Sequence, residues 1–574
     1  MRRGCMQRTT AIGLLLVVLV FAVYGRTCTH EFTYWDDPVT VHQNPRMNPP
    51  TLSSVLWYWG HAEESIYMPL THTLWGVLAS AAYLQTPNEL GMHLNPWVFH
   101  TANVAVHSGA VIAVYALLLR LFGQLWPAAA GALLFGLHPV QVEAVGWVSG
   151  MKDLLCGMFA MIALWQYAGF ALLSRQGQPG CLTMPLSGVP ELSAEKAADS
   201  PRLAYAMATV ALVLSMLSKP TGMIVPVLAA IVDYWLVGRP ARRVIKAIWP
   251  WLLLSAGCAV VARIVQPGIG LAVTPLWTRP LIAGDTLAFY LYKLVFPAWL
   301  AVDYGRLPQL VMKTWWVWFA WIVPAAVGVI LWLGRRDRAA FLAGGLLFVG
   351  GILPVLGVVR FAFQFYSTTA DHYLYPSMLG PAVAVAWVLS RYGRRAVSVA
   401  AIVVLIALGA WAMRQAGYWS DALTLWEHNV EVNPRSYAGH VSIGNALSRM
   451  GRAAEAGAYY RKSVQLNPRY VRGLDNLAMW LIQRGELSEA VGYIRDFLRV
   501  TDAYPAKVRP DNTSVHYQLG CVLLSLGRLD DAMEQFRLVL DRQPSHEGAA
   551  KGLEQASARH KAAATRPATL RSVK

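Results

Sequence analysis

Two adjacent carboxylates, Asp36 and Asp37, stand in the segment Trp35-Asp36-Asp37-Pro38, close after the first apolar run of the chain. Adjacent carboxylates at a membrane surface cost free energy unless they are paired, bind a cation or exchange protons. The alternative is a solvated turn, because Asp-Pro is a common turn dipeptide. The dipeptide alone leaves acid–base chemistry, cation binding and a plain turn all open.

Further polar residues gather near the ends of other apolar segments. They are His100, Asn103 and His107; His138, Glu143, Lys152 and Asp153; Lys219; and Asp371, His372 and Tyr373. Neighbouring helices would satisfy His107, and a lone Lys219 can extend its amine to the membrane interface. If these segments face one compartment, the cations would hold phosphate while one aspartate deprotonates an attacking hydroxyl. This combination suits an anionic, lipid-linked substrate.

Membrane helices must position these residues. The chain of 574 residues is 56% hydrophobic and only 14% charged, whereas a soluble protein carries about a quarter charged residues. A span needs about twenty apolar residues. The segments that approach this length are 9–25, 97–119, 126–140, 152–173, 203–218, 221–237, 247–265, 313–333, 340–358, 376–390 and 396–414.

The basic residues predict how these spans are oriented. The net charge of +17 comes mostly from short clusters between apolar runs, and without a basic face interleaved with aromatic residues we expect no nucleic-acid binding. With the amino terminus in the cytoplasm, the positive-inside rule places these clusters inside. The loops concerned are 120–125, 174–202, 238–246, 334–339 and 391–395.

This orientation has further consequences for the chain. The stretches 66–84 and 281–300 become helices at the outer membrane surface, or partly re-entrant ones. The polar loop 174–202 becomes a flexible cytoplasmic linker. The predicted site and the region after the last span then lie on the non-cytoplasmic side, and we expect a bacterial inner membrane.

A helical repeat with a period of 34 residues begins after residue 434. Its recurring residues are Gly444, Ala456, Tyr460 and Pro468, then Ala478, Ala490 and Ile494, and, after an insertion near 503–512, Gly520, Ala532, Phe536 and Pro544. Small residues at the eighth and twentieth positions of a tetratricopeptide repeat let its two helices approach closely. Such repeats usually bind an extended peptide or another protein.

These patterns divide the chain into three parts. We predict a membrane domain over 1–415, a repeat domain over 416–556 and a disordered basic tail over 557–574. Upstream of the three matching repeats, Ala422, Trp426 and Pro434 fit the second half of a fourth one. The last membrane span would supply its first helix.

Six motifs in a fixed order give the chain a resemblance to a known family. They are Trp35-Asp36-Asp37-Pro38, Tyr67-Met68-Pro69-Leu70-Thr71, Phe99-His100-Thr101-Ala102-Asn103, Leu137-His138-Pro139 with Glu143, Leu217-Ser218-Lys219-Pro220, and Ala370-Asp371-His372-Tyr373. With the trailing repeats, the set resembles the transmembrane and tetratricopeptide-repeat O-mannosyltransferase-like proteins. That resemblance implies an all-α, GT-C-like membrane bundle of about eleven spans followed by a tetratricopeptide α-solenoid.

The resemblance also implies roles for individual residues. Asp36 or Asp37 would be the base that activates an acceptor hydroxyl. From their charge and position, Lys219, Lys152 and His372 would contact the phosphate of a polyprenyl-phosphate sugar. The remaining predicted substrate-binding residues are His100, His138, Glu143, Asp371 and Tyr373. The displacement would invert the anomeric carbon and release polyprenyl phosphate.

Three features of this chain depart from the family pattern. Met151 and His372 stand where the family usually has arginine, and a residue is missing between Tyr375 and Pro376. Neutral histidine binds phosphate less well than arginine does. Donor recognition would therefore differ, or activity would be lost.

The predicted function is an integral membrane glycosyltransferase that moves mannose or a similar sugar from a polyprenyl-phosphate donor to a protein or glycan hydroxyl. The alternative is a non-catalytic, membrane-anchored scaffold whose repeats hold a partner in envelope assembly or secretion. A transporter fits less well, because its site would lie near the membrane midplane. No cofactor is certain, and the aspartates leave a divalent cation open.

Overall fold

The computed structural model describes residues 2–63, 66–88, 91–175, 200–266, 275–333, 338–357, 361–504 and 509–564. Over these ranges the chain is helical, with three isolated β-bridges and no strand. The all-α prediction is therefore confirmed. The chain forms two compact units, which divide between Val432 and Asn433.

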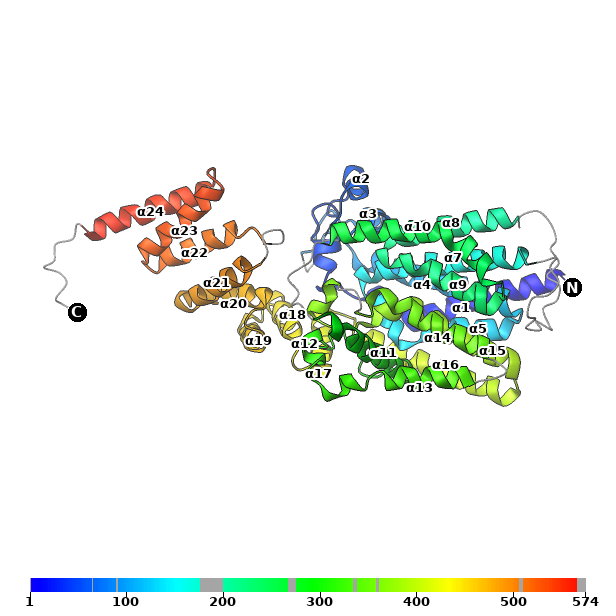
Figure 1. Ribbon diagram of the computed structural model, residues 1–574. Helices are drawn as coiled ribbons and strands as arrows, with labels where there is room; N and C mark the ends of the chain where they lie inside the picture. The colour runs from blue at the N-terminus through cyan, green and yellow to red at the C-terminus, as the bar shows by residue number, and fades with distance from the viewer. Residues whose placement is uncertain are drawn as a thin grey trace. The chain divides into compact units, whose positions relative to one another are not determined.

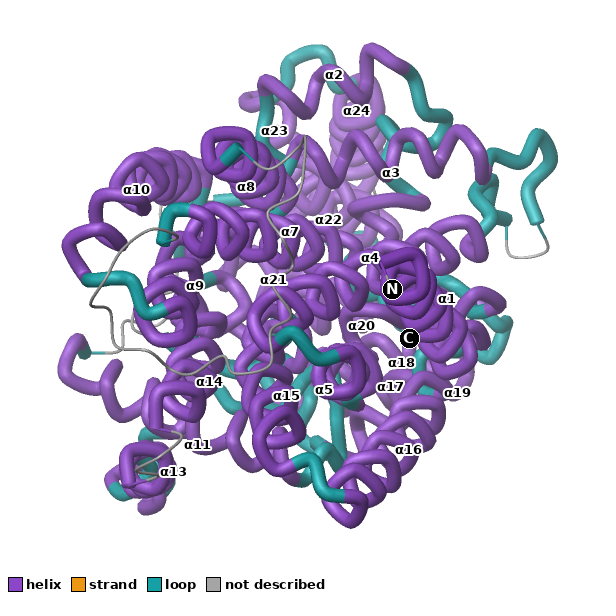
Figure 2. Tube along the Cα trace, turned by 90° about the vertical axis from the view of Figure 1, so that its right-hand side faces the viewer, coloured by secondary structure: helices purple, strands orange, loops and turns teal. Residues whose placement is uncertain are grey.

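The first unit is a bundle of apolar helices. Its main apolar helices are α1 (Arg2–Tyr24), α4 (Pro96–Phe122), α5 (Leu125–Leu137), α7 (Met151–Leu173), α8 (Pro201–Ser218), α9 (Val225–Ile231), α10 (Ala241–Val265), α13 (Ile322–Leu333), α14 (Arg338–Ile352), α15 (Leu379–Tyr392) and α16 (Arg395–Gly417). Figure 2 shows α7 inside this bundle and α10, α13 and α16 at its periphery. The peripheral helices are apolar yet little buried in protein, as helices that face lipid must be.

Fewer helices meet the length and hydropathy of a membrane span than the eleven segments predicted. Each of the eleven predicted segments contains helix, but only eight helices in the described ranges are long and apolar enough to cross a membrane. A ninth is possible if α5 and α6 (Val142–Gly146), which meet at a 51° bend, form one span. Pro139 lies at that bend and cannot donate the backbone hydrogen bond that would continue α5. Helices α14 and α15 have 15 and 14 residues and are shorter than a span.

Loops that were predicted to share a compartment lie together at one end of the bundle. Gln124 Nε2 donates to the Ser390 carbonyl at 3.4 Å, and Arg175 Nη1 donates to the Val237 carbonyl at 2.6 Å. The amino terminus lies at this end, whereas α2 (Leu52–Gly60), α3 (Pro69–Ala82) and α17 (Ala422–Val432) lie at the other (Figure 1). Residues 176–199 of the predicted flexible linker and 334–337 lie outside the described residues. Which end faces the cytoplasm stays a prediction.

The two stretches predicted to lie at the membrane surface or to be partly re-entrant, 66–84 and 281–300, contain helices, as expected. The stretch 66–84 contains α3 with 14 residues, and 281–300 contains most of α11 (Arg279–Val295) with 17. Neither is among the helices that meet the length and hydropathy of a span. Their position at the membrane surface stays a prediction.

The second unit consists of paired helices. They are α18 (Tyr437–Arg449), α19 (Ala453–Leu466), α20 (Val471–Gln483), α21 (Leu487–Asp502), α22 (Thr513–Ser525), α23 (Leu529–Arg542) and α24 (Glu547–Ala564). Gly444 lies so close to Tyr460 that a β-carbon there would come within 2.5 Å of the ring. Gly451 has a φ of 76°, which favours glycine at the turn between paired helices. The three predicted repeats are confirmed.

Two predicted boundaries differ in the structure. Helix α17, expected to belong to the repeats, groups with the first unit. Residues 557–564, expected to be disordered, continue α24, because this stretch is rich in alanine, the strongest helix former. Ala556 just before it is fully buried among repeat residues. Residues 565–574 lie outside the described residues.

Candidate active site

Asp37 anchors the segment that follows the first apolar helix. The residue is fully buried, and its Oδ2 accepts hydrogen bonds from the backbone and the hydroxyl of Thr33, both at 3.0 Å. Its Oδ1 accepts from the Ser149 backbone at 3.0 Å and the Ser149 hydroxyl at 2.6 Å. Four donors therefore occupy both carboxylate oxygens. This carboxylate fixes the loop against the start of α7 and has little capacity left to take a proton from a substrate.

Asp36 is the accessible carboxylate of the pair. Its side chain is 42% exposed, and its Oδ2 lies 3.3 Å from the Nζ of Lys152. The Lys152 amine also lies 4.6 Å from the centre of the Trp147 ring. Because the Asp36 carboxylate is partly exposed, it can come within hydrogen-bond reach of a substrate hydroxyl, as a general base must.

A second ion pair joins the start of α7 to the end of α8. The Nζ of Lys219 lies 2.6 Å from Oδ1 of Asp153, and both side chains are at most 10% exposed. Helix α8 ends here because the residue before a proline disfavours helical geometry, and Lys219 is extended, with φ −157° and ψ 136°. Oδ2 of Asp153 is buried without a hydrogen-bond partner among the described residues. Asp153 is also within electrostatic range of Lys152 and His372.

His372 is held by Glu143. The His372 backbone N–H donates to one Glu143 oxygen at 2.9 Å, and its Nδ1 lies 2.9 Å from the other. The His372 ring centre lies 5.8 Å from that of Trp147, and the next residue, Tyr373, has its ring centre 5.5 Å from Lys219 Nζ. The 3-10 turn 371–374 thus carries both side chains to the residues around the two lysines. Six of the predicted residues are brought together here: Asp36, Glu143, Lys152, Lys219, His372 and Tyr373.

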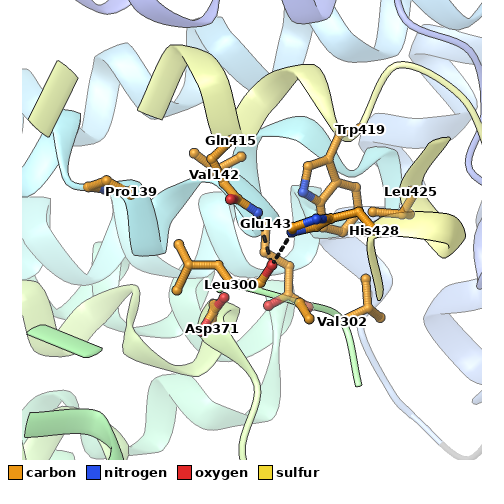
Figure 3. A pocket seen from close by; sticks show the side chains of 11 residues that line it. Pro139, Val142, Glu143, Leu300, Val302, Asp371, Gln415, Trp419, Leu425 and His428 are labelled. Atoms are coloured by element: carbon orange, nitrogen blue, oxygen red, sulfur yellow. Dashed lines mark hydrogen bonds between the residues drawn. The ribbon is translucent and has the colours of Figure 1, made fainter. Parts of the chain in front are cut away.

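Asp371 faces a small neighbouring cavity. Both of its carboxylate oxygens accept from the Tyr304 hydroxyl, at 2.8 and 2.9 Å. Figure 3 shows it on the same cavity wall as Glu143, beneath Gln415 and His428, which both bond the Leu300 carbonyl. Burial and the negative charge of Glu143 raise the pKa of Asp371 well above its usual range.

The predicted histidines of the bundle interior bond to backbone. Nε2 of His100 lies 3.2 Å from the Glu31 carbonyl, and Nε2 of His138 lies 3.1 Å from the Leu294 carbonyl. His107 bonds the Tyr375 hydroxyl at 2.9 Å and the Gly136 carbonyl at 3.0 Å, so neighbouring helices satisfy it as expected. For His100 and His138, a role toward substrate stays a prediction.

A group of polar residues beside Asp371 escaped the sequence analysis. The Lys293 amine donates to the carbonyls of Ala298 and Trp299 at 2.6 and 3.0 Å, and Arg306 pairs with Asp285. Burial lowers the pKa of Lys293, while Asp371 opposes that shift. The available signal was the presence of Asp285 and Lys293 within the apolar stretch 281–300, with Arg306 shortly after it. No sequence motif marks these polar residues.

The two aspartates do not form a cation site in this arrangement. Thr33 and Ser149 occupy Asp37, while Asp36 turns to Lys152. Across the described ranges, no cluster of three or more His, Cys, Asp or Glu side chains is placed to hold a metal ion. Participation of a divalent cation stays open.

Known proteins resemble both parts of the chain. A family described as tetratricopeptide repeat matches residues 438–470 and 513–546. Human protein O-mannosyl-transferase TMTC1 is 24% identical over 519 residues, which cover 80% of this chain and 55% of that protein. Human protein O-mannosyl-transferase TMTC4 is 24% identical over 516 residues, covering 78% and 65%. Protein O-mannosyl-transferase F38B6.6 of Caenorhabditis elegans is 23% identical over 474 residues, covering 78% and 61%.

The chain covers only part of the length of these relatives. It spans between 55% and 65% of the length of these three relatives. Its apolar helices are those of a membrane bundle, and its repeats match a family of their own. The chain is thus a multi-pass membrane protein that is homologous to the TMTC protein O-mannosyl-transferases and carries tetratricopeptide repeats in its carboxyl-terminal region.

Proposed function

We propose that this protein is a membrane glycosyltransferase that moves mannose or a similar sugar from a polyprenyl-phosphate carrier to a hydroxyl of a protein or glycan. Its homologues are named O-mannosyl-transferases, which supports the class of reaction. The observation that carries the proposal is the half-exposed Asp36 carboxylate beside Lys152, with the Lys219–Asp153 pair next to it. We assign the base to Asp36 rather than Asp37.

In the proposed step, Asp36 accepts the proton of the acceptor hydroxyl. The acceptor oxygen forms a bond to the anomeric carbon from the face opposite the phosphate, and the carbon–oxygen bond to phosphate breaks. Polyprenyl phosphate leaves with the bonding electron pair, and the configuration at carbon inverts. When the donor binds, Lys152 would pair with the donor phosphate instead of with Asp36. The Asp36 carboxylate would then be free to accept the proton of the acceptor hydroxyl.

Cations serve this step because charge develops on the leaving group. The phosphodiester donor carries one negative charge, and the phosphomonoester that leaves carries a second. Fixed cations aimed at such charge stabilise the transition state more than the ground state. Lys152 and Lys219 would supply that field. His372, held by Glu143, stands where the O-mannosyltransferase-like family usually has arginine and would contact the phosphate.

The repeat domain would recruit the acceptor. Tetratricopeptide repeats bind peptides and proteins along their stacked helices, and three of them follow the membrane unit here. We place both the site and the repeats on the non-cytoplasmic face, where positive-inside orientation puts them.

The test is transfer by purified protein in lipid, with radiolabelled polyprenyl-phosphate mannose and a hydroxyl-bearing protein acceptor. Asp36→Asn should abolish transfer while donor still raises the thermal unfolding temperature. Lys219→Ala should weaken that thermal shift. Full transfer by Asp36→Asn would overturn the mechanism. If no lipid-linked sugar stabilises the wild type, the non-catalytic scaffold becomes the better account.

A further inference from the structure

Helix α17 is fixed onto the loops of the membrane unit. The Asn429 side-chain oxygen accepts from the Asp303 backbone at 2.8 Å. The His428 ring stacks on Tyr418, with centres 3.7 Å apart, and its Nε2 lies 3.0 Å from the Leu300 carbonyl. Although its sequence fits half of a repeat, the helix is therefore built into the same unit as the candidate site.

The side chain at the centre of this contact is Trp426. It is fully buried, and its ring centre lies 5.0 Å from that of Trp35, the residue that directly precedes Asp36. The Trp426 indole N–H has no hydrogen-bond partner among the described residues. Trp426 therefore contacts Trp35 by packing of the two indole rings. The Trp35 ring centre also lies 5.0 Å from that of Tyr366.

The backbone beside Trp35 needs such support. Tyr34 has a φ of 55°, a left-handed conformation that costs a bulky residue free energy and that surrounding contacts must maintain. The turn that follows points three consecutive side chains at three different elements. Trp35 packs against α17, Asp36 pairs with Lys152, and Asp37 bonds Ser149.

We propose that Trp426 is a positioning residue for Asp36. By packing against Trp35 it holds one side of the strained turn while Asp37 holds the other, so that Asp36 stays beside Lys152. Helix α17 is then a part of the catalytic platform. This inference rests on the proposed function for its catalytic consequence, but its structural content can be measured without a substrate.

The experiment compares Trp426→Ala, Trp426→Phe and, as a matched control, Trp251→Ala in the full chain. Trp251 is an equally buried tryptophan, on α10, that contacts Tyr167 and Thr209. In Trp426→Ala we expect kcat to fall about tenfold to a hundredfold, the range that small misplacement of a reacting group produces. The KM for the donor should change little, because the lysines are untouched. Trp426→Phe keeps an aromatic ring and should restore most of kcat.

Hydrogen exchange supplies the second readout. The amides of Thr33, Val39 and Thr40 bond to Asp37 or to the Asp36 carbonyl. These amides should exchange faster in Trp426→Ala than in Trp426→Phe or Trp251→Ala. The amides of α4 should exchange at the same rate in all three variants. Unchanged exchange and kcat in Trp426→Ala would overturn the inference, as would an equal loss of kcat in Trp251→Ala. If the wild type transfers no sugar, the proposed function fails, and the exchange result alone decides the role of Trp426.

Discussion

At the scale of single residues, the Asp-Asp pair separates into a buried anchor, Asp37, and an accessible carboxylate, Asp36. The difference could not be read from the sequence, because it depends on Ser149, which lies 112 residues from Asp37 in the chain. The same limit applies to Asp371. Its motif predicted a place at the site, but its carboxylate bonds Tyr304, a residue that no motif singled out. The sequence predicted which residues are polar at this end of the bundle, and packing determines which of them are free.

The anchor role predicts a stability defect in Asp37→Asn. An amide replaces one carboxylate oxygen with a donor, which must face the N–H or hydroxyl of Thr33 or Ser149. Leaving such buried groups unsatisfied costs about 1–3 kcal/mol, so the free energy of unfolding should fall by that amount. Asp36→Asn is the control and should lose less stability, because Asp36 is partly exposed and an asparagine oxygen can still accept from the Lys152 amine. Equal stability of the two variants would refute the anchor.

The buried carboxyl of Asp371 predicts a pH dependence of stability. Its pKa is raised in the folded protein, so the folded state holds a proton that the unfolded chain has already lost above about pH 4. Stability present below that pH is therefore lost as the pH rises toward the folded pKa. Asp371→Asn lacks this proton. Its unfolding temperature should increasingly exceed that of the wild type from about pH 4 upward. A wild type that gains stability over the variant with rising pH would instead mean an ionised Asp371.

At the scale of elements, apolar runs and repeat offsets predicted most of the helices. Every predicted span contains helix, and Gly444 and Ala456 lie where the repeat period requires. The lengths were less predictable. Helix α5 breaks at Pro139, and α15 is only 14 residues long, because protein around these helices, rather than the bilayer alone, covers their backbone. Hydropathy cannot distinguish a short buried helix from a short span.

Variants of the Lys219–Asp153 ion pair, between α7 and α8, distinguish its effect on stability from its effect on donor binding. Lys219→Ala leaves the Asp153 carboxylate buried and unpaired, and breaking a buried pair in this way costs about 3–5 kcal/mol. A neutral pair, Asp153→Asn with Lys219→Met, should recover most of the unfolding free energy. It should not recover the thermal shift caused by the polyprenyl-phosphate sugar, because the cation is gone. Restored donor binding in the double variant would exclude Lys219 as a phosphate ligand.

At the scale of the whole molecule, we expect the functional boundary to follow the division into compact units rather than the end of the last span. The membrane unit extends through α17 to Val432, and Trp426 contacts Trp35 within it. A chain cut after Val432 should insert and unfold as the membrane unit does, and bind the polyprenyl-phosphate sugar with the affinity of the full chain. It should lose transfer to protein acceptors that the repeats recruit. A chain cut after residue 415 removes α17 as well.

The two truncated chains therefore differ only by residues 416–432, which include α17. The shorter chain should show faster hydrogen exchange at Thr33, Val39 and Thr40, because Trp35 loses its partner. It should also be thermally less stable than the chain that ends at Val432, since the bonds from Asn429 and His428 to the loop 300–303 are lost. Equal exchange in the two chains would show that Tyr366 and Asp37 alone hold the turn. The repeats would then begin, in functional terms, at residue 416.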